Sequence, residues 1–111
     1  MTAADILVVL VTTPSVEDGQ TIARSLVAEG LAACVNVVPG VRSVFFWEGR
    51  LQEEVEALLV VKTRRERYEA LQRRILELHA YSIPEVLALP VETGSPAYLA
   101  WVAETVRTEW G

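Results

Sequence analysis

The order in which strand-like and helix-like segments follow one another constrains this chain more than any other feature of its sequence. Residues 6–11 are consecutive aliphatic residues, which is typical of a strand buried on both faces. Ser15 suits a helix N-cap, and apolar residues at helical spacing continue toward Gly30, where glycine favours a helix end. The sequence therefore predicts an initial strand followed by a helix.

Two strands joined by a tight turn are predicted next. Residues 33–47 predict one long strand, bulged at Pro39-Gly40 because proline cannot donate to the strand ladder and glycine permits a kink. Glu48-Gly49 is a typical hairpin turn, and residues 53–63 predict the return strand. The first half of the return strand alternates polar and apolar residues, so we expect that half to be partly exposed and the rest to be buried.

The second half of the chain repeats the alternation of helix and strand. Thr63 and Glu66 match the capping box T-x-x-E, which predicts that the second helix opens there. A short strand is expected over residues 85–91. Ser95-Pro96 then predicts the start of a last amphipathic helix, which we expect to end near Trp110.

The first six predicted elements have the order of a split βαββαβ unit. Such a unit forms an antiparallel four-stranded sheet with both helices on one face. We therefore predict a ferredoxin-like sandwich of the α/β (α+β) class, with an additional C-terminal helix and a long hairpin between the second and third strands. The sequence has no internal repeat, linker or low-complexity segment, so residues 1–111 are expected to form a single domain.

Charge and composition argue against several classes of function. The net charge is −5, whereas proteins that bind nucleic acids present a basic face to the phosphates. The apolar run at residues 6–11 is much shorter than the roughly 20 residues that span a membrane. The N-terminus offers no signal peptide, and the single cysteine, Cys34, excludes an internal disulfide. We therefore expect a cytoplasmic protein that binds neither nucleic acid nor membrane.

Few residues point to a chemical activity. Cys34 lies in an apolar stretch, where a buried hydrophobic role competes with a role as a thiol ligand. His79 ends the predicted second helix, where the helix dipole favours it, and metal contact is the alternative. Glu53, Glu54 and Glu56 suit a solvated strand edge or, alternatively, a hard cation. The spacings H-x-x-x-H, C-x-x-C and H-E-x-x-H do not occur in the sequence, and we expect a protein that is not an enzyme.

A series of short motifs runs through most of the chain, from residue 8 to residue 101. In order, they are Thr12-Thr13-Pro14, Leu31-Ala32-Ala33-Cys34-Val35-Asn36, Pro39-Gly40 with Ser43, Trp47-Glu48-Gly49, Val61-Lys62-Thr63, His79-Ala80-Tyr81 with Pro84-Glu85, Leu89-Pro90 and Tyr98-Leu99-Ala100-Trp101. Each motif alone is weak. Together, in this order and spacing, they resemble the CutA-type divalent-cation tolerance family.

The resemblance implies a homotrimer that responds to divalent cations, chiefly copper. The hairpin over residues 43–54 would add strands to neighbouring copies, which suits its apolar tip. Family members with proposed metal ligands have a cysteine where this chain has Val11, and two adjacent histidines where it has Leu78-His79. The remaining candidate ligands for Cu(II) or another divalent cation are His79, Cys34 and Glu85.

The resemblance also implies a polar cleft between subunits, which maps onto Asn36, Trp47, Lys62, Tyr81 and Glu85. A buried ion pair between Lys62 and Glu85 is the alternative to a small-ligand site there. Two other functions stay open beside a role in metal-ion response. One is a signalling trimer like the nitrogen-regulatory PII proteins, which hold small ligands in clefts between subunits. The other is a non-catalytic interaction module.

Overall fold

Four strands and three α-helices follow the predicted order in the computed structural model, which describes residues 2–106. The strands and helices are β1 (Ile6–Thr13), α1 (Val16–Ala28), β2 (Cys34–Trp47), β3 (Arg50–Arg64), α2 (Tyr68–Leu78), β4 (Val86–Pro90) and α3 (Pro96–Thr105). Two single 3-10 turns, η1 (Ala3–Asp5) and η2 (Arg65–Arg67), precede β1 and α2. The helix α3 ends at Thr105, and the predicted end near Trp110 lies outside the described residues.

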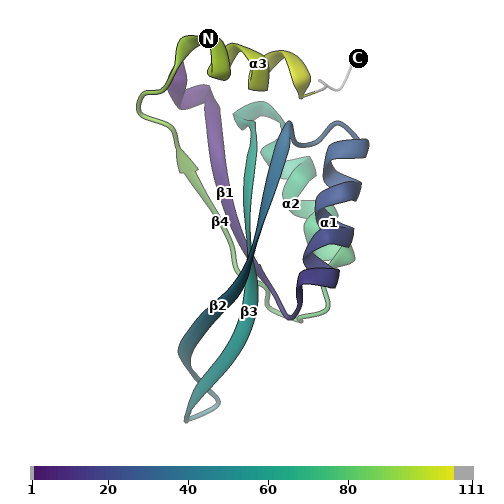
Figure 1. Ribbon diagram of the computed structural model, residues 1–111, viewed down its shortest axis with the longest axis vertical. Coiled ribbons are helices and arrows are strands. Elements are labelled where there is room, and N and C mark those ends of the chain that lie inside the picture. The colour runs from purple at the N-terminus through teal and green to yellow at the C-terminus, as the bar shows by residue number, and fades with distance from the viewer. Residues whose placement is uncertain (1, 107–111) are drawn as a thin grey trace.

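The strands form one antiparallel sheet in the order β2-β3-β1-β4. Val9 of β1 sits between Val61 of β3 and Ala88 of β4, so β1 is a central strand with a partner on each side. Helices α1 and α2 lie together on one face of this sheet (Figure 1). The predicted ferredoxin-like arrangement with an additional C-terminal helix is therefore confirmed.

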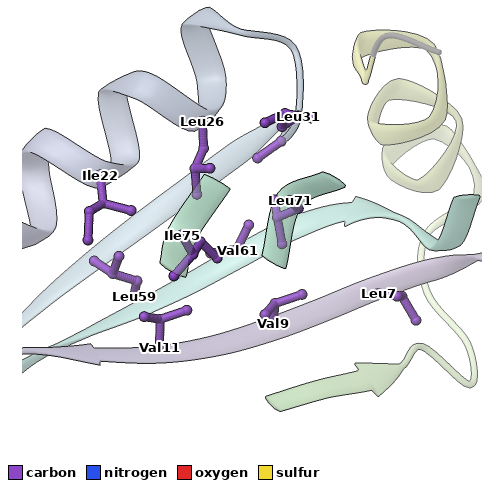
Figure 2. Close-up of a cluster of buried hydrophobic side chains, with 11 residues drawn as sticks. Leu7, Val9, Val11, Ile22, Leu26, Leu31, Leu59, Val61, Leu71 and Ile75 are labelled. Atoms are coloured by element: carbon purple, nitrogen blue, oxygen red, sulfur yellow. The ribbon is translucent and has the colours of Figure 1, made fainter. Parts of the chain in front are cut away.

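The core lies between α1, α2 and the face of the sheet that they cover. Because strand residues alternate between faces, every second residue of β1 and β3 points at the helices. Figure 2 shows these side chains meeting the apolar stripes of both helices; they are Leu7, Val9, Val11, Leu59 and Val61 from the strands, with Ile22, Leu26, Leu71 and Ile75 from the helices. We call the opposite face, which carries Val8, Leu10, Val60 and Leu87 by the same alternation, the open face.

The helix α3 lies across one end of the molecule, away from the hairpin (Figure 1). Its Val102 is fully buried in a second, smaller cluster with Ile6, Ala33 and Val106. Arg64 at the end of β3 donates a hydrogen bond of 3.2 Å to the carbonyl oxygen of Ala103. The additional helix therefore closes one end of the sheet rather than covering the whole open face.

The strands β2 and β3 continue well beyond the helices as a long twisted hairpin (Figure 1). The register between them shifts between Val38 and Val41, which confirms the bulge predicted at Pro39-Gly40. The turn has positive φ at both Glu48 (50°) and Gly49 (75°), as a type I′ hairpin requires. The predicted position of this turn is therefore confirmed.

The capping box predicted at Thr63 is wrong. Thr63 lies in β3, is fully buried on the helix-covered face, and donates a hydrogen bond of 2.7 Å from its hydroxyl to the carbonyl oxygen of Leu31. The helix α2 begins later, at Tyr68, after the turn η2. By contrast Ser15 is a true N-cap, since its hydroxyl oxygen accepts a hydrogen bond of 3.1 Å from the Asp18 amide.

The exposed edge predicted for the first half of β3 is correct for Glu53 and Glu54 but wrong for Glu56. Glu56 is only 8% exposed, whereas its neighbour Val55 is 59% exposed. The cause is the strand alternation: Val55 shares the side of Ala57, but it lies beyond Ala57, the last β3 residue that pairs with β1, and its side chain is exposed there. Glu56 takes the other side, where Tyr81 meets it.

Candidate functional site

A groove of about 910 Å³ lies between the hairpin, from Glu56 to Trp47, and the loop between α2 and β4. This volume is within the range of roughly 300–1,000 Å³ that small-molecule sites occupy. The hairpin lines it with Ser43, Val44, Phe45, Trp47, Gln52, Glu54 and Glu56. The loop contributes Ala80, Tyr81, Ser82, Ile83 and Glu85, and Thr12 and Pro14 complete the lining.

Glu56 and Tyr81 form the fixed polar contact of this groove. The Tyr81 hydroxyl donates a hydrogen bond of 2.8 Å to Oε2 of Glu56. Burial, the hydrogen bond and the negative charge of Glu56 raise the pKa of Tyr81 to about 12. Tyr81 therefore stays a neutral donor at neutral pH and holds the Glu56 carboxylate in one orientation.

His79 fastens the loop that carries Tyr81. Its Nε2 lies 2.7 Å from the carbonyl oxygen of Thr12, and its Nδ1 lies 3.1 Å from the backbone nitrogen of Tyr81. A carbonyl oxygen only accepts and a backbone amide only donates, so the imidazole is neutral with its proton on Nε2. The His79 and Tyr81 rings also contact each other at a centroid distance of 4.9 Å. Both ring nitrogens are thus engaged within the chain.

The residues of the predicted cleft divide between two places in a single chain. Trp47, Tyr81 and Glu85 all line the groove. Lys62 and Asn36 are elsewhere on the sheet, where the Lys62 ammonium donates a hydrogen bond to Oδ1 of Asn36. Within residues 2–106 no ion pair joins Lys62 to Glu85.

Of the three candidate metal ligands, Cys34 lies away from His79 within one chain. Cys34 opens β2 and pairs with Lys62, which pairs in turn with Val8 of β1. His79 contacts Thr12, four residues further along β1, about 13 Å at the usual rise of a strand. Across the described part of the chain, no three histidine, cysteine or acidic side chains form a group suited to a metal ion.

Cys34 is half-buried beside α3 rather than enclosed in the core. The pKa of Tyr98 in α3 is raised by burial, and the neighbouring Cys34 contributes through its charge and a hydrogen bond. The sequence placed Cys34 in an apolar strand, but the helix that approaches it comes from the far end of the chain. Local sequence therefore gave no signal for the Tyr98 contact.

Sequence reasoning named Glu56 only with Glu53 and Glu54, as a solvated edge or a hard-cation site, and did not place it beside Tyr81. Strand alternation places Glu56 on the same face as Val60 and Leu58, the open face, so its side of the sheet was predictable from the sequence. Its burial depends on Tyr81, 25 residues later, and no local pattern predicts that contact.

None of the helices within residues 2–106 is long and apolar enough to cross a membrane.

Comparison with known proteins shows which family this chain resembles. The family model described as "CutA1 divalent ion tolerance protein" matches residues 7–105. The "Divalent-cation tolerance protein CutA" of Thermus thermophilus is 48% identical over 97 residues, which are 87% of this chain and 94% of that protein. The resemblance seen in the sequence motifs is therefore confirmed.

Plant proteins are similar as well. The rice "Protein CutA 1, chloroplastic" is 46% identical over 101 residues, which are 91% of this chain and 57% of the rice protein. This chain thus spans little more than half the length of the curated plant relatives. The crystal structure of rice CutA1 superimposes with a TM-score of 0.91 at 44% identity, covering 96% of this chain and 98% of that one. From its sequence and its fold alike, this chain belongs to the CutA1 divalent ion tolerance protein family.

Proposed function

We propose that this chain acts in divalent-cation tolerance as a cytoplasmic homotrimer that binds Cu(II) or another divalent cation and catalyses no reaction. The observation that carries the proposal is the match of residues 7–105 to a family named for ion tolerance. The Thermus thermophilus relative has nearly the same length as this chain and is likewise named for divalent-cation tolerance. The proposed compartment is supported by the single cysteine of the sequence.

The exposed apolar surface of the hairpin supports a trimer. Four apolar side chains line one side of the hairpin beyond the helices: Val44, Phe46, Leu51 and Val55. Phe46 and Leu51 lie directly opposite each other, and each is 71% exposed. An apolar patch at the end of a long hairpin favours pairing with another chain, because water solvates it poorly.

The edge strands of the sheet are suited to pairing with the hairpin of a neighbouring copy. Both β2 and β4 are edge strands, so each has backbone groups on its outer side that a neighbouring copy can pair with. Leu87 and Leu89 of β4 are about half exposed on the open face. A trimer in which each hairpin lies against the next copy would bury both surfaces, and we propose this arrangement.

A metal site in such an assembly would draw on His79, Cys34 and Glu85. Imidazole and thiolate groups suit copper, and a carboxylate adds an oxygen ligand. Because Cys34 lies away from His79 within one chain, a site that uses both requires neighbouring copies to bring them together. Binding at His79 would also displace one of its two present partners, the Thr12 carbonyl oxygen or the Tyr81 amide.

Calorimetric titration of the protein with Cu(II), beside sedimentation of the same sample, tests this proposal. We expect a trimer with saturable binding near one ion per chain or one per trimer. His79→Ala should lower the affinity for Cu(II), whereas Glu69→Ala, an exposed carboxylate on α2, should not change it. A trimer that takes up no ion would contradict the metal role.

A second function, small-ligand signalling in the manner of PII proteins, is favoured by the groove. Trp47, Tyr81 and Glu85 line a volume of ligand size. Asn36 and Lys62 would join them only across two copies. A Lys62→Ala variant distinguishes the two functions, because it should weaken binding of an anionic metabolite such as ATP and leave the Cu(II) titration unchanged.

A further inference from the structure

The strand β2 has one more residue than its partner β3 at the start of the long hairpin. From Val38 to Val41 the chain advances three residues, whereas the partners of these two residues, Leu58 and Glu56, are two residues apart. The extra residue forms a β-bulge, and Gly40 within it has a φ of 70°. A Cβ atom added to Gly40 would have no atom within 4 Å. Glycine is therefore favoured here by the left-handed backbone and not by a lack of space.

This bulge reverses the faces that alternate residues of β2 take. Before it, Val35 and Val37 pack against the core beneath the helices. After it, Ser43, Phe45 and Trp47 line the groove on the other face, although regular alternation would place them on the side of Val37. The bulge thus accommodates the extra residue and brings two aromatic rings to the groove.

The bulge lies where the hairpin leaves the rest of the sheet. The last pair between β1 and β3 joins Thr13 to Ala57, and the next residue along β3 toward the hairpin, Glu56, is opposite Val41. Beyond this point β2 and β3 pair only with each other, and Figure 1 shows them twisting together away from the sheet. A bulge bends its strand and increases the local right-handed twist. The direction of the hairpin is therefore set at this junction.

The direction of the hairpin decides how copies of the chain associate in the proposed trimer. The hairpin of one copy lies against an edge strand of the next, so two different surfaces meet in a head-to-tail contact. Such contacts form a closed ring only when the rotation from copy to copy is a whole fraction of a turn, and they form open filaments otherwise. A trimer requires a rotation of one third of a turn.

We propose that the bulge at Pro39-Gly40 fixes this rotation, and that Gly40 is a positioning residue for closure of the trimer. The hairpin side chains supply the contact surface, and the bulge supplies the angle at which that surface meets the next copy. The inference rests on the trimer of the proposed function and is independent of the Cu(II) site.

A variant with a regular β2 strand tests the inference. Deletion of Gly40 together with Pro39→Thr leaves one residue between Val38 and Val41, as β3 has between their partners, so the pairing on both sides of the bulge is retained. The same side chains then face the groove and the next copy, and only the bend and the added twist are lost. We expect sedimentation equilibrium to show loss of the trimer in favour of monomers or open polymers, with native circular dichroism.

Two substitutions change the backbone preference without changing the length of the strand. Gly40→Val disfavours a positive φ, because a β-branched residue is strained there, and should raise the concentration at which the trimer dissociates about tenfold or more. The matched control is Gly40→Asn, which adds a side chain of similar size but tolerates the left-handed region, and should dissociate like the wild type. The control also separates backbone strain from a clash with a neighbouring copy.

The wild-type protein, measured in the same experiment, separates this inference from the proposed function. A wild type that is not trimeric would contradict both. A trimeric wild type with an equally stable trimer in the deletion variant would overturn the inference alone. If the deletion variant is unfolded, the two substitutions decide. Equal dissociation of Gly40→Val and Gly40→Asn would overturn the inference, and a weakened trimer in Gly40→Val alone would support it.

Discussion

His79 joins the strand β1 to the loop after α2, with its Nε2 only 2.7 Å from the carbonyl oxygen of Thr12. Its second nitrogen accepts the amide of Tyr81, and Tyr81 in turn bonds to Glu56. One imidazole therefore sets the position of the loop that closes the groove. The helix-dipole role predicted for His79 did not include these contacts, which join residues far apart in the sequence.

We expect His79→Ala to lower the free energy of unfolding by about 1–3 kcal/mol, because it leaves the Thr12 carbonyl oxygen without its partner. His79→Gln places an amide donor near the Nε2 position and should recover part of this loss. Urea denaturation at one fixed protein concentration measures both variants, since association also changes apparent stability. Equal stability of wild type and His79→Ala would show that the imidazole does not hold the loop.

The Tyr81–Glu56 hydrogen bond predicts an alkaline titration. The pKa of Tyr81 is raised from 10.0 to about 12 in the folded protein. A raised folded pKa means that the contribution to stability is complete below pH 10 and is lost as the pH rises toward 12. Difference absorbance of tyrosinate between wild type and Tyr81→Phe should show this group titrating near pH 12.

Glu56→Gln provides the control for that titration. It removes the negative charge but not the burial, so the pKa of Tyr81 should fall below 12 without returning fully to 10.0. A Tyr81 pKa that is the same in Glu56→Gln and wild type would mean that the carboxylate has no influence on the hydroxyl.

Thr63 is expected to stabilise the fold through one buried hydrogen bond. Thr63→Val keeps the shape of the side chain but leaves the Leu31 carbonyl oxygen unsatisfied, which should cost about 1–3 kcal/mol of unfolding free energy. The matched control Thr93→Val changes an exposed residue and should have little effect. Chemical denaturation compares the two, and similar small losses would contradict the role of this bond.

The hairpin stripe of Val44, Phe46, Leu51 and Val55 is expected to hold the assembly together. Phe46→Lys with Leu51→Lys places two charges on that stripe, and should yield monomers whose circular dichroism stays native, since both residues are exposed in one chain. Val27→Lys with Leu76→Lys, exposed on the helices, serves as the control and should not change the assembly. A doubly substituted hairpin that sediments like wild type would exclude the stripe from the interface.

The sequence predicts the elements of this fold well because their signals are local. Alternation and apolar runs locate the strands, and Pro39-Gly40 and Glu48-Gly49 locate the bulge and the turn. The exception is Thr63, where a T-x-x-E pattern occurs at the end of a strand. The hydroxyl bonds to Leu31, 32 residues earlier, instead of capping a helix. A pattern of four residues contains no information about that distant partner.

The candidate site was only partly predictable for the same reason. Trp47, Tyr81 and Glu85 were identified from the family motifs, and the structure brings them to one groove. Glu56 was expected at a solvated edge or, alternatively, as a ligand of a hard cation. Its burial was not predictable, because it depends on a loop that His79 joins to Thr12. Asn36, Lys62 and Cys34 lie away from that groove, on paired positions of β2 and β3, and the sequence motifs did not predict this separation within one chain.

Sedimentation equilibrium of the wild-type protein tests the central claim, a homotrimer built through the hairpin, most directly. The account predicts a single species with three times the mass of the 12.3 kDa chain, stable on dilution. A species that sediments at the mass of one chain over the same concentrations would contradict the trimer. It would also contradict any metal or ligand site that requires neighbouring copies.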